Sequence, residues 1–306
     1  RTHFLLARNE DEVGAITGVM PLFLVPSLLT GRAWMTLPGG LCADSEAAAS
    51  ALLQRAQEIA RGGQAKRLLI QDSRHAWPGD LHTVSNHVAW LVDVHGTQEE
   101  LERRLHRNVR RQIRMARNNG LTVTVERSGH TLDDFYHVMS HFTHQAGTPV
   151  FGRHFVQNVV DNLPGQFSIV TVYSDAAPIG SYFQLELGDT VYGLWGATLH
   201  EYLELRPVYL AYWTILADAS QRGFTQVDMG RSPVDSNAAK FKRQWGGESV
   251  PIYQQSMAFD GTVAAGITER TQNDGKLQSF MQLWPKIPFP VAQFLGPKLR
   301  RHVPFA

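Results

Sequence analysis

The chain has 306 residues, of which 43% are hydrophobic and 19% are charged, and its formal net charge is +1. This is the composition of a globular protein with enough apolar material for a sizeable core, and the length favours two domains over one. A charge so close to neutral excludes a protein that binds polyanions over its whole surface. Any contact with nucleic acid must therefore come from a local basic patch.

The cysteine and histidine content argues against a metal site. Cys42 is the only cysteine, which excludes an intrachain disulfide and a cysteine-rich metal centre. His141 and His144 would share a helix face, and we interpret them as a surface pair rather than as ligands. No signal peptide is visible, and prolines interrupt the apolar residues 14–31, which predicts strand, turn and strand rather than a membrane span. We expect a cytoplasmic protein without a metal; the start at Arg1 leaves open whether the natural N-terminus is present.

Hydrophobic periodicity predicts an α+β protein of two similar parts. In the first part, two strands precede a capped helix and two more strands follow it, at 3–9, 13–25, 44–63, 65–72 and 87–94. In the second part, a strand and two helices precede a three-stranded meander, a long helix and two final strands, at 121–127, 131–147, 151–163, 167–174, 177–187, 189–198, 206–223, 225–230 and 249–259. The similar order of elements indicates tandem domains.

A basic segment, residues 97–120, joins the two parts and is predicted as one helix. Thr97 and Glu100 form a capping box at its start, and Asn119 with Gly120 ends it. Apolar residues at helical spacing form one face, namely Leu101, Leu105, Val109, Ile113 and Ala116. Arginines form a second face, namely Arg103, Arg104, Arg107, Arg110, Arg111, Arg114 and Arg117. This arginine face either contacts phosphate or nucleic acid, which suits the guanidinium fork, or is a solvated helix surface.

Three segments resemble the FemAB-like family, and in particular its members found beside exosortase and exopolysaccharide loci. They are RNVRRQIRMARNNGLTV (107–123), AGTPVFGRHF (146–155) and VDMGRSPVDSNAAKFKRQWGGESVPIY (227–253), and the closing residues 283–301 are similar to the family's common tail. The resemblance implies two tandem GNAT-like domains with mixed central sheets flanked by helices. Their expected ranges are 1–96 and 121–275, with the basic helix 97–120 between them and a Pro-rich tail at 276–306.

The same resemblance implies an activity. The family's better understood members transfer an aminoacyl group from aminoacyl-tRNA to an amine of a peptidoglycan precursor, and others go under an acetyltransferase label. We therefore expect an acyltransferase that acts on an amino group of a cell-envelope or exopolysaccharide precursor. It would have no tightly bound cofactor and would use aminoacyl-tRNA or acyl-CoA as the donor. A typical acetyl-CoA enzyme of this fold carries a glycine-rich loop at a helix start, whereas residues 200–213 contain no glycine.

The loop that begins at Asp228 supplies the candidate catalytic residues. Lys242, in the family-matched pair FK, would stabilise developing negative charge or a phosphate; otherwise it is a surface lysine next to an inward-facing Trp245. Arg231 follows a buried strand, so it either binds a carboxylate or phosphate or pairs with Asp228. Asp228 is either a base or orienting group, or it orders the loop through Asx-type hydrogen bonds. Acyl transfer to an amine needs no nucleophilic triad, and no GxSxG is visible.

Strand alternation places Tyr182, Gln184 and Glu186 on one face of the meander, where they could line a substrate groove. Trp195 and Tyr192 belong either to this groove or to the core. The predicted substrate contacts are Tyr182, Gln184, Trp245, Arg110, Arg111 and Arg114.

The tail mixes apolar residues with Lys298, Arg300 and Arg301. Either it packs across the domain, or it lies on an anionic membrane surface, which would suit a lipid-linked acceptor. The expected partners are a small-molecule or lipid-linked acceptor and a tRNA at Arg103–Arg117. Two other functions stay open, namely a non-catalytic GNAT-like module that binds RNA or a partner protein, and an acetyl-CoA-dependent N-acetyltransferase.

Overall fold

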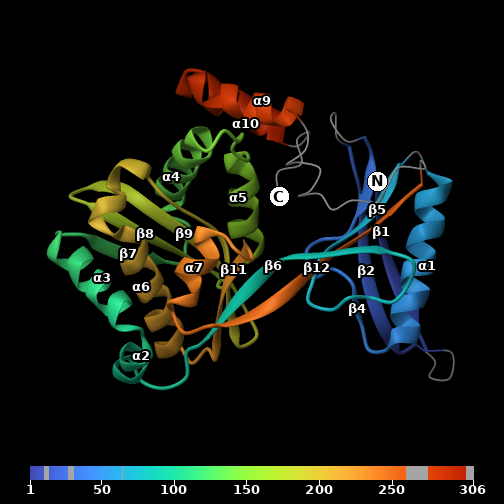
Figure 1. Ribbon diagram of the computed structural model, residues 1–306, viewed down its shortest axis with the longest axis horizontal. Helices are drawn as coiled ribbons and strands as arrows, with labels where there is room; N and C mark the ends of the chain where they lie inside the picture. Colours follow the sequence, from blue (N-terminus) through green and yellow to red (C-terminus); the bar gives the residue numbers. More distant parts are fainter. Residues whose placement is uncertain (10–13, 27–30, 64, 260–274, 301–306) are drawn as a thin grey trace. The chain divides into compact units, whose positions relative to one another are not determined.

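The chain forms two compact units. The computed structural model in Figure 1 describes residues 1–9, 14–26, 31–63, 65–259 and 275–300. Unit 1 comprises the described residues of 1–87 and 251–279, and unit 2 comprises 88–250 and 280–300. Two long strands, β6 (His82–Asp93) and β12 (Glu248–Ala258), contribute residues to both units. The predicted ranges 1–96, 97–120, 121–275 and 276–306 differ from this division, because the basic segment lies within unit 2 and most of β12 within unit 1.

Unit 1 is a sheet with one helix on its face. Its strands follow the order β1-β2-β3-β5-β12, with β4 paired to β2; the bounds are β1 Thr2–Arg8, β2 Ile16–Val25, β3 Ala33–Met35, β4 Cys42–Ala43 and β5 Arg67–Ser73. Helix α1 (Glu46–Gly62) begins at Ser45, whose hydroxyl accepts a hydrogen bond from the Ala48 N–H at 3.2 Å. The alanines and leucines of α1 pack on Met20, Leu22 and Leu68 to form the core of the unit.

Strand β2 continues through Pro21, one of the prolines that interrupt the apolar residues 14–31. On one side Pro21 lies opposite Phe4 of β1. On the other side, Gly18 and Val19 pair with β4, and Phe23 to Val25 pair with β3. Pro21 falls in the gap between these two pairings, where its missing N–H costs no ladder hydrogen bond.

Unit 2 is a mixed sheet with helices on both faces. Its strand order is β6-β11-β10-β9-β8-β7, antiparallel from β7 to β10 and parallel between β10 and β11; the bounds are β7 Thr122–Glu126, β8 Phe167–Ser174, β9 Ala177–Leu187, β10 Thr190–Thr198 and β11 Gln226–Pro233. Helices α4 (Leu132–Gln145) and α5 (Arg153–Asn162) cover one face, and α6 (Pro207–Gln221) covers the other (Figure 1). Strand alternation sorts the core accordingly, because Phe183 packs under α4 and Tyr182 under α6.

The basic segment is two helices rather than the predicted one. Helix α2 (Gln98–Arg104) starts with the predicted capping box of Thr97 and Glu100. Leu105 then takes an extended conformation, and His106 caps α3 (Arg107–Asn118) by accepting a hydrogen bond from the Asn108 N–H at 3.2 Å. The predicted apolar face is buried throughout, so the spacing identified the inward side correctly. The arginine face is interrupted between α2 and α3.

The C-terminal segment forms α9 (Gly275–Leu283), a 3₁₀ turn η2 (Trp284–Lys286) and α10 (Phe289–Arg300). Both η2 and α10 contact α4. His144 is bonded through Nε2 to the Ile287 carbonyl at 2.9 Å, so it is not one of a simple surface pair. The described part of the tail therefore packs on α4, as one of the two alternatives predicted; residues 301–306, with Arg301, lie outside the described residues. No helix among the described residues is long and apolar enough to cross a membrane.

Candidate functional site

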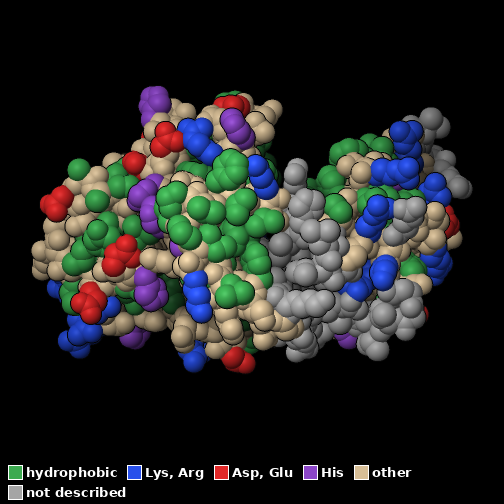
Figure 2. All heavy atoms as spheres, turned by 90° about the horizontal axis from the view of Figure 1, so that it is seen from above, with side chains coloured by type: hydrophobic (Ala, Val, Ile, Leu, Met, Phe, Trp, Pro, Cys, Tyr) green, Lys and Arg blue, Asp and Glu red, His purple; other side chains and the backbone are tan. Residues whose placement is uncertain are grey.

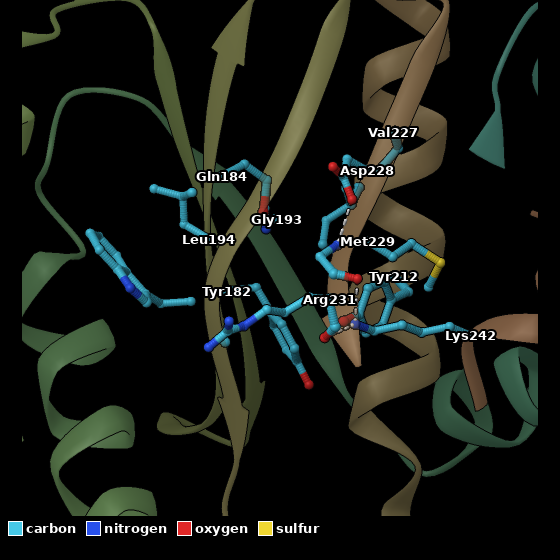
Figure 3. A pocket seen from close by; sticks show the side chains of 14 residues that line it. Tyr182, Gln184, Gly193, Leu194, Tyr212, Val227, Asp228, Met229, Arg231 and Lys242 are labelled. Atoms are coloured by element: carbon cyan, nitrogen blue, oxygen red, sulfur yellow. Dashed lines mark hydrogen bonds between the residues drawn. The ribbon is translucent and has the colours of Figure 1, made fainter. Parts of the chain in front are cut away.

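A pocket of about 210 Å³ lies in unit 2 where β10 and β11 stop pairing (Figure 3). The two strands pair from Thr190–Gln226 to Tyr192–Asp228, yet β10 runs on to Thr198 and β11 to Pro233. The lining comes from β9, β10, α6, β11 and α7 (Asn237–Arg243). It consists of Tyr182, Gln184, Gly193, Leu194, Trp195, Gly196, Tyr212, Ile215, Val227, Asp228, Met229, Gly230, Arg231 and Lys242. The pocket therefore opens at the point where two neighbouring strands leave a gap in the sheet.

Glycines allow the backbone and side chains to approach closely around this gap. A Cβ on Gly230, whose φ is +75°, would lie 2.9 Å from the Gly193 carbonyl oxygen across the two strands. A Cβ on Gly196 would lie 2.2 Å from the ring of Tyr182. Leu194 sits at a register shift between β10 and β9. The wall of the pocket depends on Gly196 and Gly230 having no side chain.

Lys242 is buried at the pocket, with 8% of its surface exposed. Its helix α7 starts at Ser236, whose hydroxyl accepts a hydrogen bond from the Ala239 N–H at 3.1 Å. The Lys242 ammonium donates to the carbonyls of Gly230 at 2.9 Å and Arg231 at 3.0 Å (Figure 3). Burial lowers the pKa of Lys242 to about 8, and the charge of Asp228 opposes that shift. The interpretation as a surface lysine is therefore wrong.

Asp228 and Arg231 stand on the same strand as the carbonyls that bind Lys242. The buried Asp228 carboxylate accepts a hydrogen bond from the Gly230 N–H at 2.9 Å, which is the predicted Asx-type ordering of the loop. It also acts electrostatically on Lys242. Arg231 is half-buried and lines the pocket. One end of β11 thus gathers two cations and one anion.

Tyr182 and Gln184 form the opposite wall, as the strand alternation predicted. The Tyr182 hydroxyl is 2.7 Å from Thr198 Oγ1, and its ring centroid is 5.5 Å from that of Tyr212. Burial raises the pKa of Tyr182 and that of Tyr212, the latter to about 12, so both phenols stay neutral. Gln184 is 2% exposed, and its side-chain amide oxygen, Oε1, has no hydrogen-bond partner in the protein. A buried, unsatisfied acceptor beside a pocket is suited to a ligand N–H.

The other predicted contacts lie away from the pocket lining. Trp245 is 2% exposed, packs with Phe241 and Tyr212 in the core, and does not line the pocket. Arg110, Arg111 and Arg114 lie on α3, which packs against α6. Trp195, predicted to belong either to the groove or to the core, does both, because it lines the pocket and packs with Phe183.

Sequence reasoning missed Tyr212 and the glycines of the pocket wall. Tyr212 reads as one more apolar residue of a long helix, whereas the glycines of YGLWG and DMG were a visible signal, because glycine within a strand marks a close backbone approach.

The arrangement can hold negative charge and position an amide. Lys242 and Arg231 supply positive charge, Gln184 supplies a carbonyl acceptor, and the aromatic rings exclude water from the wall. With a pKa of about 8, Lys242 is also able to exchange a proton near neutral pH. Among the described residues, no group of three or more His, Cys, Asp or Glu is placed to hold a metal ion.

Comparison with known proteins identifies the domain that carries the pocket. Residues 103–243 match the family of acetyltransferase (GNAT) domains. A comparison with curated protein sequences gave no match. Among solved structures, the chain resembles FemX with a TM-score of 0.62 and 17% identity, over 89% of this chain and 90% of that one.

Two further structures share the fold. The C-terminal domain (DUF2156) of a protein described as a putative lysylphosphatidylglycerol synthetase from Agrobacterium fabrum has a TM-score of 0.60 and 13% identity, over 83% and 84% of the two chains. A tandem GNAT protein from the clavulanic acid biosynthesis pathway has a TM-score of 0.53 and 12% identity, over 84% and 83%.

The family match and the solved structures agree on the GNAT fold for the part of the chain that carries the pocket. Residues 103–243 form a GNAT domain, and the chain as a whole has the tandem GNAT fold of FemAB-like proteins. Nothing in these comparisons singles out the exosortase-associated subgroup.

Proposed function

We propose that the protein transfers an acyl or aminoacyl group to an amino group of a cell-envelope or exopolysaccharide precursor in the cytoplasm. The observation that carries the proposal is Lys242, a buried lysine bonded to two carbonyls at the end of β11, in the gap between β10 and β11. Acyl transfer needs a donor carbonyl that is held and polarised, and an amine that has lost its proton. A cation that is shielded from water interacts more strongly with a developing oxyanion than an exposed one does.

In this proposal five of the pocket residues have a role. Lys242 and Arg231 stabilise negative charge that develops on the donor carbonyl oxygen or on a phosphate of a substrate. Gln184 accepts a hydrogen bond from an amide N–H of the donor, which satisfies its unpaired carbonyl oxygen. Asp228 holds the loop through Gly230 and keeps the pKa of Lys242 from falling further. Tyr182 packs beneath Gly196 and shapes the wall.

The donor is either an aminoacyl-tRNA or an acyl-CoA. Four arginines of α3 are exposed, namely Arg107, Arg111, Arg114 and Arg117, and Arg110 is half-buried. Residues 103–118 contain no acidic residue, so this surface favours an RNA donor. The evidence on CoA comes from the start of helix α6. This helix is preceded by the 3₁₀ turn η1 (His200–Leu205) and by Arg206 at φ +67°, and glycine is absent there. That entry offers no glycine-rich cradle for a pyrophosphate, which weighs against CoA in the ordinary mode.

A donor competition tests the proposal. Purified protein is given radiolabelled aminoacyl-tRNA or acetyl-CoA together with amino-sugar and lipid-linked amine acceptors, and labelled product is measured. We expect turnover with one donor and its loss in Lys242→Met. No product with any pairing would sink the proposal. A rise in melting temperature with acetyl-CoA but not with tRNA would assign the donor to CoA and favour an N-acetyltransferase.

A non-catalytic RNA-binding module is the second candidate, and the exposed arginines of α3 favour it. In that case RNA binding would persist in Lys242→Met and no acceptor would be modified.

A further inference from the structure

The C-terminal segment has one face that packs on unit 2 and another that is open to solvent. Trp284, Ala292 and Gly296 are buried, and a Cβ on Gly296 would lie 3.2 Å from the backbone of Val150. Leu283, Val291 and Phe294 are instead 58%, 46% and 65% exposed. The close contacts of the buried face fix the exposed apolar residues in place, so they do not form a loose end that folds on binding.

The exposed residues follow helical spacing. Val291, Phe294 and Lys298 are three and four residues apart on α10, so they form one stripe. The Lys298 ammonium lies 3.9 Å from the centroid of the Phe294 ring. Lys286, in η2, is also exposed. We name Leu283, Lys286, Val291, Phe294 and Lys298 the tail face. Figure 2 shows hydrophobic side chains gathered on unit 2, with Lys, Arg, His and Asp or Glu side chains around them.

The charged side chains of the tail segment itself have one sign. Residues 275–300 contain no Asp or Glu, while Lys286, Lys298 and Arg300 are basic. A protein partner usually meets an apolar core bordered by mixed polar residues. Exposed apolar side chains that alternate with lysines along one segment instead match a lipid interface, where the apolar groups enter the acyl boundary and the long basic side chains reach the phosphates.

We propose that the tail face docks on a bilayer surface that contains anionic phospholipid. Leu283, Val291 and Phe294 insert between the headgroups, and Lys286 and Lys298 contact lipid phosphates. Neither signal holds a protein on a membrane alone, so the attachment is reversible and needs both. This inference does not rest on acyl transfer, because it concerns a surface distinct from the pocket lining.

Vesicle sedimentation tests the docking. The full chain is mixed with vesicles of phosphatidylcholine alone or of phosphatidylcholine with phosphatidylglycerol, and the bound fraction is measured without donor or acceptor. We expect binding only to the anionic vesicles and its loss at about 1 M salt, where the screening length falls to about 3 Å. Phe294→Ser should weaken binding about tenfold, and Lys286→Glu with Lys298→Glu by at least about as much.

Matched variants exclude a general effect. Leu187→Ser removes an apolar side chain that is 67% exposed at the end of β9, and Lys240→Glu reverses an exposed lysine of α7. Both should bind anionic vesicles like the unmodified protein, and all variants should keep its melting temperature. Absence of binding to anionic vesicles, or equal binding by Phe294→Ser, overturns the proposal. It is also overturned if the protein is a dimer that Phe294→Ser converts to a monomer, because a second copy would then occupy the face.

Discussion

Lys242 and the arginines of α3 are both basic features of unit 2, but they differ in exposure and therefore in what they can do. Lys242 is enclosed, and its pKa falls to about 8 because the protein has removed water from it. Arg107, Arg111 and Arg114 are exposed and attract anions only through a screened field. Lys240, two residues before Lys242 on α7, is exposed as well. Burial, and not the residue type, therefore distinguishes a cation that can take part in catalysis from cations that only attract anions to the surface.

The largest effect should come from removing the enclosed cation. Lys242→Met keeps the length of the side chain and removes its charge, so we expect turnover to fall about 100-fold or more, which is the effect of losing one group that stabilises an oxyanion. Steady-state kinetics measure it, with Lys240→Met as the control that should retain activity. An equal loss in both variants would mean that the two lysines do not differ as their burial indicates.

The pH dependence of stability should show the same burial. The pKa of Lys242 is 10.5 in the unfolded chain and about 8 in the folded protein, so the unfolded chain binds more protons between these values. Stability of the native protein therefore rises with pH across that window, and below it the buried ammonium costs up to about 3 kcal/mol.

Urea unfolding of Lys242→Met and of the unmodified protein at a series of pH values measures this cost. The free energy of unfolding of the variant should exceed that of the unmodified protein most below pH 8. The difference between the two free energies should shrink as the pH rises. A difference that stays constant with pH would contradict the shift.

A smaller effect is expected on the uncharged wall of the pocket. Tyr182→Phe keeps the ring under Gly196 and removes the hydroxyl that lies 2.7 Å from Thr198 Oγ1. Loss of a buried hydrogen bond should lower the free energy of unfolding by about 1–2 kcal/mol. Tyr192→Phe, a half-buried tyrosine of β10, is the comparison and should change it by less than about 0.5 kcal/mol. Equal changes would show that the Tyr182 hydroxyl bond contributes nothing.

The smallest effect on stability belongs to the exposed arginines. Replacing Arg107, Arg111 and Arg114 with Gln should leave the free energy of unfolding within about 0.5 kcal/mol. If α3 binds RNA, the slope of log affinity against log salt should fall by about two to three, roughly one per lost phosphate contact. Filter binding over a salt series measures the slope. If the affinity of the unmodified protein for RNA does not change with salt, α3 does not bind RNA through its arginines.

The sequence predicted local elements better than their environment. Periodicity, together with the caps and turns that bound each segment, placed α1, α4, α5, α6 and the meander, although α6 and β8 are buried on more than one side. It missed the break at Leu105 and His106, since the heptad-like spacing of apolar residues runs straight through it. It also missed β3 and β4, which are three and two residues long; β3 forms through its pairing with β2 and β5, and β4 through its pairing with β2.

The site was predicted in part for the same reason. Motif resemblance singled out Asp228, Arg231 and Lys242, and strand alternation added Tyr182 and Gln184; the structure brings all five to one pocket. Spacing alone could not say that Lys242 is enclosed while Trp245 is turned into the core. Lys242 and Trp245 belong to the same short amphipathic turn. Lys242 is enclosed because its ammonium binds two carbonyls of β11, whereas Trp245 packs against Phe241.

The last strand of unit 1 has a consequence for how the protein is made. β5 finds its antiparallel neighbour in β12, where Tyr253 to Ala258 pair with residues 67–73. During synthesis the ribosome must add more than half of the chain before that partner exists, whereas most of the sheet of unit 2 emerges as one run. Nascent chains that stop before β12 should therefore expose an unpaired β5 edge to chaperones, proteases and other chains, and a gene fragment that encodes only the first 87 residues should give an insoluble product.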